Sequence, residues 1–178
     1  MNHIKLFEQY NDGLSEWFGE SKVVDSEGNP LLVYHGSKSK FNTYDKDKIS
    51  TGGSEGILQY GHGFYFSNRK DIAVQYGENV HSVYLKIENP IHMNHHNDEV
   101  PDNLINFCVE NYPSLKTLSD FEYKMNVGSV HRILRFLQKK YHNTDDVLKE
   151  LGYDGIFDLG DYASVYVVFV NEQIKIIK

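Results

Sequence analysis

Two short hydrophobic stretches carry the side chains of this sequence that are best suited to binding chemistry. Residues 31–37 end in His35-Gly36-Ser37, and residues 61–68 place Tyr65 between two phenylalanines. Both are β-prone runs bounded by Gly, Pro or Asn, as expected of strands that deliver side chains to a binding site. An imidazole forms directed hydrogen bonds near neutral pH, and a tyrosine ring offers a flat face for stacking. We therefore expect the two stretches to meet in one cleft.

Each of these residues also has a purely structural explanation. A lone histidine at the end of a strand is more often a structural hydrogen bonder, and Tyr65 and Tyr76 would by default be core or rim aromatics. Gly61 and Gly63 equally suit a bulge or a tight turn. The residue types alone leave both interpretations open.

Composition predicts one compact domain, residues 1–178, with a real core. The sequence has 178 residues, of which 40% are hydrophobic and 24% charged, and a net charge of −7 that argues against a DNA-coating protein. Cys108 is the only cysteine, so an intramolecular disulfide and a cysteine-based zinc cluster are excluded. Residues 1–10 lack the apolar core of a signal peptide, and no later run reaches about 18 apolar residues. We expect a cytoplasmic protein that does not enter a membrane.

The pattern around the two stretches predicts the elements that position them. Residues 3–18 have helical spacing broken near Gly13, and the turn-rich residues 25–30 predict a hairpin whose second strand carries His35. Residues 46–56 form a charged loop without periodicity. Residues 72–76 then suit a short helix beneath the Tyr65 strand, and residues 80–87 alternate as a half-buried strand.

Helical periodicity replaces this pattern between about residues 91 and 152, which we interpret as a helical insertion. Within it, Ser129 is a candidate N-cap, and residues 143–145 begin a further helix that ends at Gly152. Strand patterns return at residues 155–157, 165–170 and 174–177. The expected fold class is α+β.

Six short segments, taken together and in this order, resemble the ADP-ribosyltransferase domains of phage and mobile-element proteins of the MuF and polyvalent types. These domains belong to the branch that includes diphtheria toxin and the poly(ADP-ribose) polymerases. The resemblance covers about two thirds of the chain, misses the helical insertion, and implies a split antiparallel β core around an NAD cleft. It rests on Trp17-Phe18-Gly19-Glu20-Ser21-Lys22-Val23-Val24-Asp25, Tyr34-His35-Gly36-Ser37, Gly63-Phe64-Tyr65-Phe66-Ser67, Tyr153-Asp154-Gly155-Ile156, Tyr166-Val167-Val168-Phe169 and Gln173-Ile174-Lys175.

The resemblance implies roles for five residues in binding NAD as co-substrate. His35 would donate a hydrogen bond to a ribose hydroxyl, and Gly36 would offer backbone groups to the nicotinamide carboxamide. Tyr65 would line the nicotinamide ribose site, and Tyr76, eleven residues later, would stack on the nicotinamide ring. Ser37 is a weaker candidate for the adenine-side ribose. Cleavage of the nicotinamide–ribose bond develops an oxocarbenium-like charge on the sugar, which fixed hydrogen bonds and aromatic faces favour by holding the dinucleotide bent.

The third catalytic position departs from the polymerase pattern. Where the polymerases carry a glutamate directly before the last aromatic strand motif, this chain has Val165. An aliphatic residue there resembles the mono-transferases, which add a single ADP-ribose unit. Asp161 lies four residues before Val165, so their side chains would point to the same face of a continuous strand. Asp161 is our candidate for a displaced catalytic carboxylate, with Asp158 as the alternative.

Two other clusters suggest different chemistry. His92, His95, His96, Asp98 and Glu99 could be interpreted as a metal site, but they lack the spacing that aligns ligands on a helix, so we expect no metal. A basic ridge at Arg132, Arg135 and Lys139 is a solvated face or, alternatively, a contact for nucleic acid or an acidic partner.

The sequence thus predicts a mono-ADP-ribosyltransferase that moves ADP-ribose from NAD to a macromolecular acceptor, protein or RNA/DNA. The resemblance suggests a phage effector or the toxin of an antiphage or toxin–antitoxin system, with an antitoxin or inhibitor protein as a possible partner. The alternatives are a non-catalytic module that binds NAD or ADP-ribose, an NAD glycohydrolase, and an interaction domain whose tyrosines are core.

Overall fold

A seven-stranded mixed sheet organises the protein, as seen in a computed structural model that describes residues 13–49, 60–93, 100–111, 130–141, 144–160 and 162–177. Residues 13–18 form a helix ahead of the sheet. The strands are β1 Val33–Ser37, β2 Phe64–Ser67, β3 Asn79–Leu85, β4 Pro90–Met93, β5 Gly155–Leu159, β6 Ser164–Val168 and β7 Ile174–Ile176. The helices are η1 Lys46–Lys48, α2 Lys70–Val74, α3 Asp102–Asn111, α5 Val130–Tyr141, α6 Thr144–Glu150 and η2 Asn171–Gln173.

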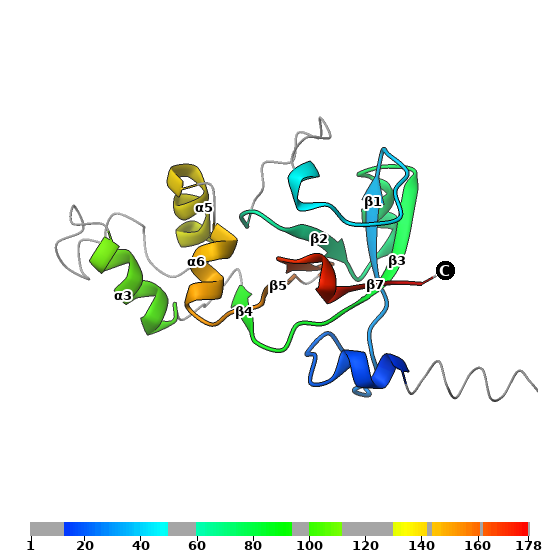
Figure 1. Ribbon diagram of the computed structural model, residues 1–178, viewed down its shortest axis with the longest axis horizontal. Helices are drawn as coiled ribbons and strands as arrows, with labels where there is room; N and C mark the ends of the chain where they lie inside the picture. The colour runs from blue at the N-terminus through cyan, green and yellow to red at the C-terminus, as the bar shows by residue number, and fades with distance from the viewer. Residues whose placement is uncertain are drawn as a thin grey trace, which may run out of the picture.

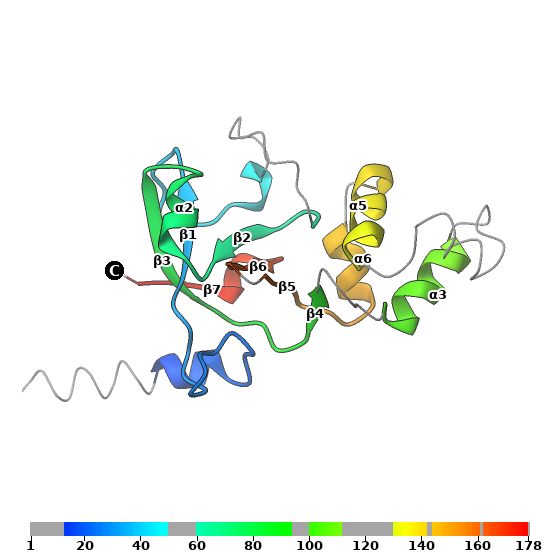
Figure 2. The same ribbon diagram turned by 180° about the vertical axis from the view of Figure 1, so that it is seen from behind.

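The strand order is β4-β5-β6-β2-β1-β3-β7, and every neighbouring pair is antiparallel except β4 with β5. The α+β class is therefore confirmed. Figure 1 shows α3, α5 and α6 gathered beyond the β4 end of the sheet, with β1 and β3 at the opposite end. The reverse view places α2 against β1 and β3 (Figure 2). The helices α3, α5 and α6 thus lie at the β4 end of the sheet, and α2 lies at the β1 and β3 end. The central strand β2 lies between these two groups of helices.

The centre of the sheet has one narrow junction. β1 pairs with β2 only through Tyr34 and Ser67, whereas five residue pairs join β1 to β3 and four join β2 to β6. The sheet therefore consists of the halves β4-β5-β6-β2 and β1-β3-β7, whose ladders are joined by a single residue pair, while one hydrophobic cluster packs across both halves. All seven strands belong to one hydrogen-bonded sheet, so the expected split into separate parts of the core is not seen among the described residues.

Side chains alternate across the sheet into two separate hydrophobic clusters. On β2, Phe64 and Phe66 pack into a cluster with Val33, whereas Tyr65 packs against the cluster that includes Leu134 of α5. This follows from the two-residue period of a strand, which sends neighbours to opposite faces. The helices α5 and α6 cover the face that presents Tyr65.

Two sequence predictions need correction. The helical stretch begins later than residue 91, because Pro90–Met93 form β4, a short strand parallel to β5. Proline is tolerated as the first residue of an edge strand, where no ladder hydrogen bond needs its nitrogen. The predicted hairpin at residues 23–30 is reduced to an isolated bridge between Val24 and Pro30. Asp25 closes the turn, since its carboxylate accepts hydrogen bonds at 2.9 Å from two backbone amides within it.

The end of α6 is confirmed in detail. Gly152 adopts a φ of +89°, and its N–H donates to Lys149 while that of Tyr153 donates to Leu148. This double hydrogen bond is the usual glycine-terminated helix end. The proposed caps at Ser129 and Asn143 lie outside the described residues.

Gly36 allows β1 and α2 to pack in direct backbone contact. A Cβ built on Gly36 would lie 1.7 Å from the carbonyl oxygen of Ala73 in α2. We predict that Gly36→Ala lowers the free energy of unfolding by about 3 kcal/mol, the upper range for overpacking, because backbone rather than a flexible side chain must move. Urea unfolding measures this loss.

Gly13→Ala is the matched control, because nothing lies within 4 Å of that position. It should leave stability equal to the wild type or raise it by up to about 1 kcal/mol through better helix propensity. Equal stability of Gly36→Ala and the wild type would contradict the packing of α2 on β1.

Candidate active site

His35 bridges the junction between the two halves of the sheet. Its Nδ1 lies 2.8 Å from the backbone carbonyl oxygen of Tyr65 on β2. Because a carbonyl only accepts hydrogen bonds, Nδ1 carries the proton, and Nε2 of the neutral ring is left as an acceptor. The bond joins β1 and β2 where their ladder has ended at Tyr34 and Ser67.

The imidazole of His35 sits among aromatic rings. Ring centroids of Tyr44, Phe66 and Phe41 lie 5.3, 5.5 and 5.9 Å away, and His81, its register partner on β3, lies at 6.5 Å. Burial lowers the pKa of His35, the hydrogen bond to Tyr65 partly opposes this, and nearby His81 lowers it further. The donor role towards ribose that the resemblance implies would need a second ring proton, which this environment disfavours. His35 is therefore arranged to accept a hydrogen bond.

The hydroxyl of Tyr65 is hydrogen-bonded within the protein, which leaves its ring for contact with a ligand. The hydroxyl donates to the carbonyl oxygen of Gly61 at 2.6 Å and accepts from the backbone N–H of Tyr60 at 3.2 Å. Burial raises the pKa of the Tyr65 phenol, so the group stays protonated. The Tyr60 ring stacks on the Tyr65 ring, with centroids 6.0 Å apart and planes 21° from parallel. Any ligand contact by Tyr65 would therefore use its half-buried ring.

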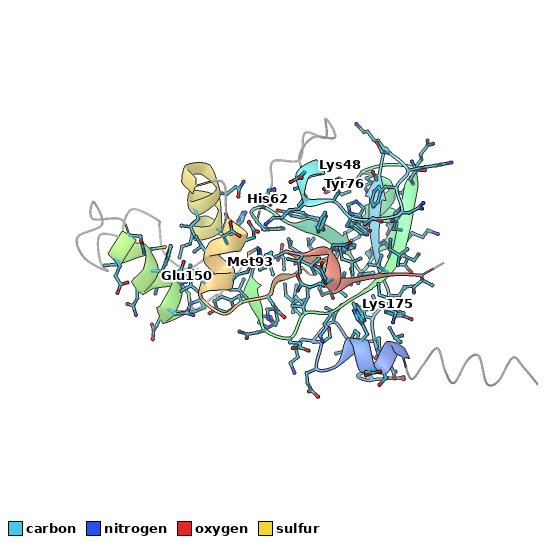
Figure 3. All side chains as sticks on the ribbon, viewed as in Figure 1. Lys48, His62, Tyr76, Met93, Glu150 and Lys175 are labelled. Atoms are coloured by element: carbon cyan, nitrogen blue, oxygen red, sulfur yellow. The ribbon has the colours of Figure 1, made fainter. Side chains whose placement is uncertain are left out.

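The other residues predicted to contact NAD are Tyr76, Gly36 and Ser37, and they differ in exposure and in hydrogen bonding. Tyr76, two residues beyond α2, is 57% exposed and lies towards the η1 side of the molecule (Figure 3). Gly36 follows His35 on β1 and has Ala73 directly over its Cα. The Ser37 hydroxyl accepts a hydrogen bond from the Ser39 amide at 3.1 Å.

Val165 and Asp158 lie opposite each other on β6 and β5, and Ser67 of β2 lies opposite Val165 on its other side. Opposed residues share a face of the sheet, so the aliphatic side chain has a carboxylate as its direct neighbour. Asp161 itself lies outside the described residues, and β6 begins only at Ser164. The catalytic role expected of Asp161 therefore stays a prediction.

Sequence reasoning missed Tyr60. Its hydroxyl donates to Oδ2 of Asp158 at 2.5 Å, and both side chains are buried. Burial raises the pKa of the Tyr60 phenol, as do the Asp158 hydrogen bond and charge and, more weakly, Tyr65 and Tyr76. Tyr60 therefore stacks on Tyr65, the tyrosine predicted to line the nicotinamide ribose site. The only sequence signal for it was the abundance of tyrosine.

The two predicted motifs therefore meet at one junction through the bond from His35 to the Tyr65 backbone. The imidazole packs against Phe66 in one hydrophobic cluster, whereas the Tyr65 ring stacks on Tyr60 against the other cluster. Comparison with family models matches residues 25–178 to the ADP-ribosyltransferase in polyvalent proteins. The chain belongs to this family. Membership confirms the resemblance drawn from the sequence motifs and implies the use of NAD.

Two further comparisons complete the picture of this ADP-ribosyltransferase family member. Among solved structures, the chain is similar to a crystal structure of an anti-CRISPR protein, with a TM-score of 0.42 and 12% sequence identity. The alignment covers 83% of this chain and 95% of that chain. No curated protein matches the sequence.

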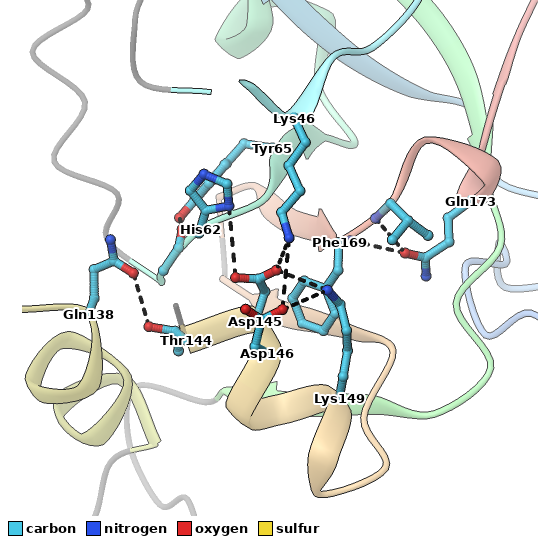
Figure 4. A network of polar contacts seen from close by, with 12 residues as sticks. Lys46, His62, Tyr65, Gln138, Thr144, Asp145, Asp146, Lys149, Phe169 and Gln173 are labelled. Atoms are coloured by element: carbon cyan, nitrogen blue, oxygen red, sulfur yellow. Dashed lines mark hydrogen bonds and ion pairs between the residues drawn. The ribbon is translucent and has the colours of Figure 1, made fainter. Parts of the chain in front are cut away.

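An ion-pair network beside Tyr65 anchors the loops around it to α6 (Figure 4). The Asp145 carboxylate, 2% exposed, accepts from Lys46 at 2.6 Å and Lys149 at 3.0 Å, and His62 lies 3.8 Å from its other oxygen. Burial raises the pKa of Asp145, but the two lysines outweigh burial and hold it below 3.8. Asp145 therefore stays ionised and fixes Lys46 of η1 and the start of β2 against the helices.

The other predicted clusters are placed only in part. His92 is exposed on β4, whereas His95, His96, Asp98 and Glu99 lie outside the described residues. Within the described part of the chain, no group of three or more His, Cys, Asp or Glu residues is arranged to hold a metal ion. The helical positions of Arg132, Arg135 and Lys139 on α5 are confirmed, but their side chains are not described. No described helix is long and apolar enough to cross a membrane.

The partly buried imidazoles of His35 and His81 predict an acid-sensitive fold. Burial lowers the pKa of both His35 and His81 from 6.5. The unfolded chain then binds more protons than the folded one as the pH falls below 6.5, so the free energy of unfolding must decrease with acidification in that range. Urea unfolding at pH 7.5 and at pH 5.5 tests this, well above the range where Asp145 titrates.

His81→Phe is the informative variant, because a phenyl ring keeps the contact with Phe41, whose centroid lies 4.3 Å from that of His81, and does not titrate. It should lose less stability than the wild type over the same pH interval. A wild-type protein equally stable at both pH values would show that the two histidines are not desolvated.

Proposed function

We propose that this protein is a mono-ADP-ribosyltransferase that transfers ADP-ribose from NAD to a macromolecular acceptor and releases nicotinamide. The observation that carries the proposal is the hydrogen bond between His35 and Tyr65, because it joins the family's two NAD-binding motifs at the junction of β1 and β2. Each motif alone occurs by chance. Their direct contact within a family member supports a working site.

In this proposal, the protein holds NAD bent across the junction. His35 Nε2 accepts a hydrogen bond from a ribose hydroxyl, and the backbone of Gly36 pairs with the nicotinamide carboxamide. Tyr65 lies beside the nicotinamide ribose, Tyr76 stacks on the nicotinamide ring, and Ser37 contacts the adenine-side ribose. Holding the dinucleotide in this geometry favours the transition state over the relaxed substrate.

The reaction breaks the bond between ribose C1 and the nicotinamide nitrogen. The bonding electrons leave with nicotinamide, which becomes neutral, and the ribose becomes oxocarbenium-like. A nucleophile of the acceptor then bonds to C1 and gives up its proton. We keep Asp161 as the candidate for the carboxylate that orients the acceptor and takes that proton.

The proposed acceptor and biological setting are supported by the family and by the net charge. The net charge of −7 favours a protein acceptor over RNA or DNA. A domain of this family suits a phage effector, or a toxin of an antiphage or toxin–antitoxin system acting in the cytoplasm. An antitoxin or inhibitor protein would then restrain it.

Val165 favours a second candidate, a non-catalytic module that binds NAD or ADP-ribose. Such a module would bind NAD saturably and release no nicotinamide. An NAD glycohydrolase would instead release nicotinamide and leave free ADP-ribose at the same rate with or without acceptor.

We predict that the wild type transfers label from adenine-labelled NAD into macromolecules of a bacterial lysate, and that His35→Ala reduces transfer by about 100-fold or more. The loss follows from misplacing the ribose by removal of the group that spans the junction. Protease or nuclease digestion of the labelled product identifies the acceptor class.

His92→Ala is the matched control, since that histidine is exposed on β4, an edge strand that three strands separate from β1. It should transfer like the wild type. Wild-type transfer by His35→Ala would refute the site, and a wild type that incorporates no label would leave the binding module or the glycohydrolase, which nicotinamide release distinguishes.

We also predict that each modified site on the acceptor receives a single unit. Chain elongation in the polymerases depends on the glutamate whose place Val165 occupies, so the product of this protein should not be extended. Mass spectrometry of the modified acceptor should find one ADP-ribose per site. A ladder of increasing mass would contradict the prediction.

A further inference from the structure

Asp158 is a buried carboxylate that the predicted NAD contacts do not use. It is 4% exposed on β5, opposite Val165, and its Oδ2 accepts a hydrogen bond from Tyr60 at 2.5 Å. Burying a charge is costly unless strong hydrogen bonds compensate, and a hydroxyl donating to a carboxylate at this distance is a strong one. The pairing therefore defines where the Tyr60 side chain lies.

Tyr60 in turn contacts Tyr65 in two ways. Its ring stacks on the Tyr65 ring, and its backbone N–H donates to the Tyr65 hydroxyl at 3.2 Å. The Tyr65 hydroxyl in turn donates to Gly61, the next residue in the chain after Tyr60. Displacing Tyr60 would thus disturb both the stacking surface and the hydrogen bonding of Tyr65.

We propose that Asp158 is a positioning residue that holds Tyr65 in place for NAD, acting through Tyr60. This inference rests on the proposed function, because it assumes that NAD contacts Tyr65. Val165 on β6 occupies the position where the polymerases carry a glutamate. Asp158 lies opposite it on the neighbouring strand β5 and acts on Tyr65 through Tyr60. Substitutions of Asp158 and Tyr60 would then have non-additive effects on the affinity for NAD.

The test is a double-mutant cycle on NAD. Tyr60→Phe keeps the stacked ring and removes only the hydroxyl, and Asp158→Asn keeps an acceptor and removes the charge. We expect each to raise the Kd for NAD, by about tenfold for Tyr60→Phe, the size expected for a hydrogen bond to a charged group, and by less for Asp158→Asn. The double variant should bind NAD no more weakly than Tyr60→Phe, because the same bond is lost.

Kinetics separate positioning from a general loss of structure. A Tyr65 contact made in both the bound substrate and the transition state gives a raised KM for NAD with kcat changed less than about threefold, measured by nicotinamide release. Tyr153→Phe is the matched control, since its hydroxyl hydrogen bonds to Asn103 beside the helices, away from the junction. It should leave Kd, KM and kcat unchanged.

Each outcome decides the inference. If Tyr60→Phe binds NAD like the wild type, or if the two losses multiply in the double variant, Asp158 does not position Tyr65. If the wild type binds NAD but releases no nicotinamide, the proposed transfer fails, and the Kd cycle still decides the role of Asp158. If the wild type does not bind NAD, both proposals fail.

Discussion

The hydrogen bond from His35 to the carbonyl of Tyr65 is the contact on which the site depends. The two halves of the sheet share only the Tyr34–Ser67 pair, and this side-chain bond of 2.8 Å continues the connection beyond it. It fixes the tautomer of the imidazole, because Nδ1 must donate. Its surroundings of aromatic rings keep the ring neutral. One interaction thus sets the geometry of the junction and the chemistry of its histidine.

The rest of the structure holds the two strands in that relation. Gly36 lets α2 approach β1 until backbones touch, which brings Tyr76 to the end of α2 near the junction. On the other side, Asp145 ties Lys46 and His62 to α6, next to the start of β2. Asp158 holds Tyr60 against Tyr65 from within the sheet. The helices of the insertion therefore support the site by anchoring loops.

The parts of this structure that local rules determine could be predicted from the sequence. β2, α2 and the end of α6 follow from strand alternation, helical spacing and a glycine after the last turn, all within a few residues. β4 could not, because its four residues alternate too briefly and its partner β5 is distant in the chain. The role of Tyr60 depends on Asp158, which is distant in the sequence on β5, so no local sequence pattern predicts it. Asp161 lies outside the described residues, so its role stays a prediction.

The most direct test of this account is a crystal structure of the protein with an NAD analogue whose nicotinamide–ribose bond cannot be cleaved. The account predicts the nicotinamide ring stacked on Tyr76 and its ribose beside Tyr65, with the carboxamide on the Gly36 backbone and a ribose hydroxyl within hydrogen-bonding distance of His35 Nε2. An analogue bound elsewhere on the protein, with the β1–β2 junction empty, would contradict the assignment of the site.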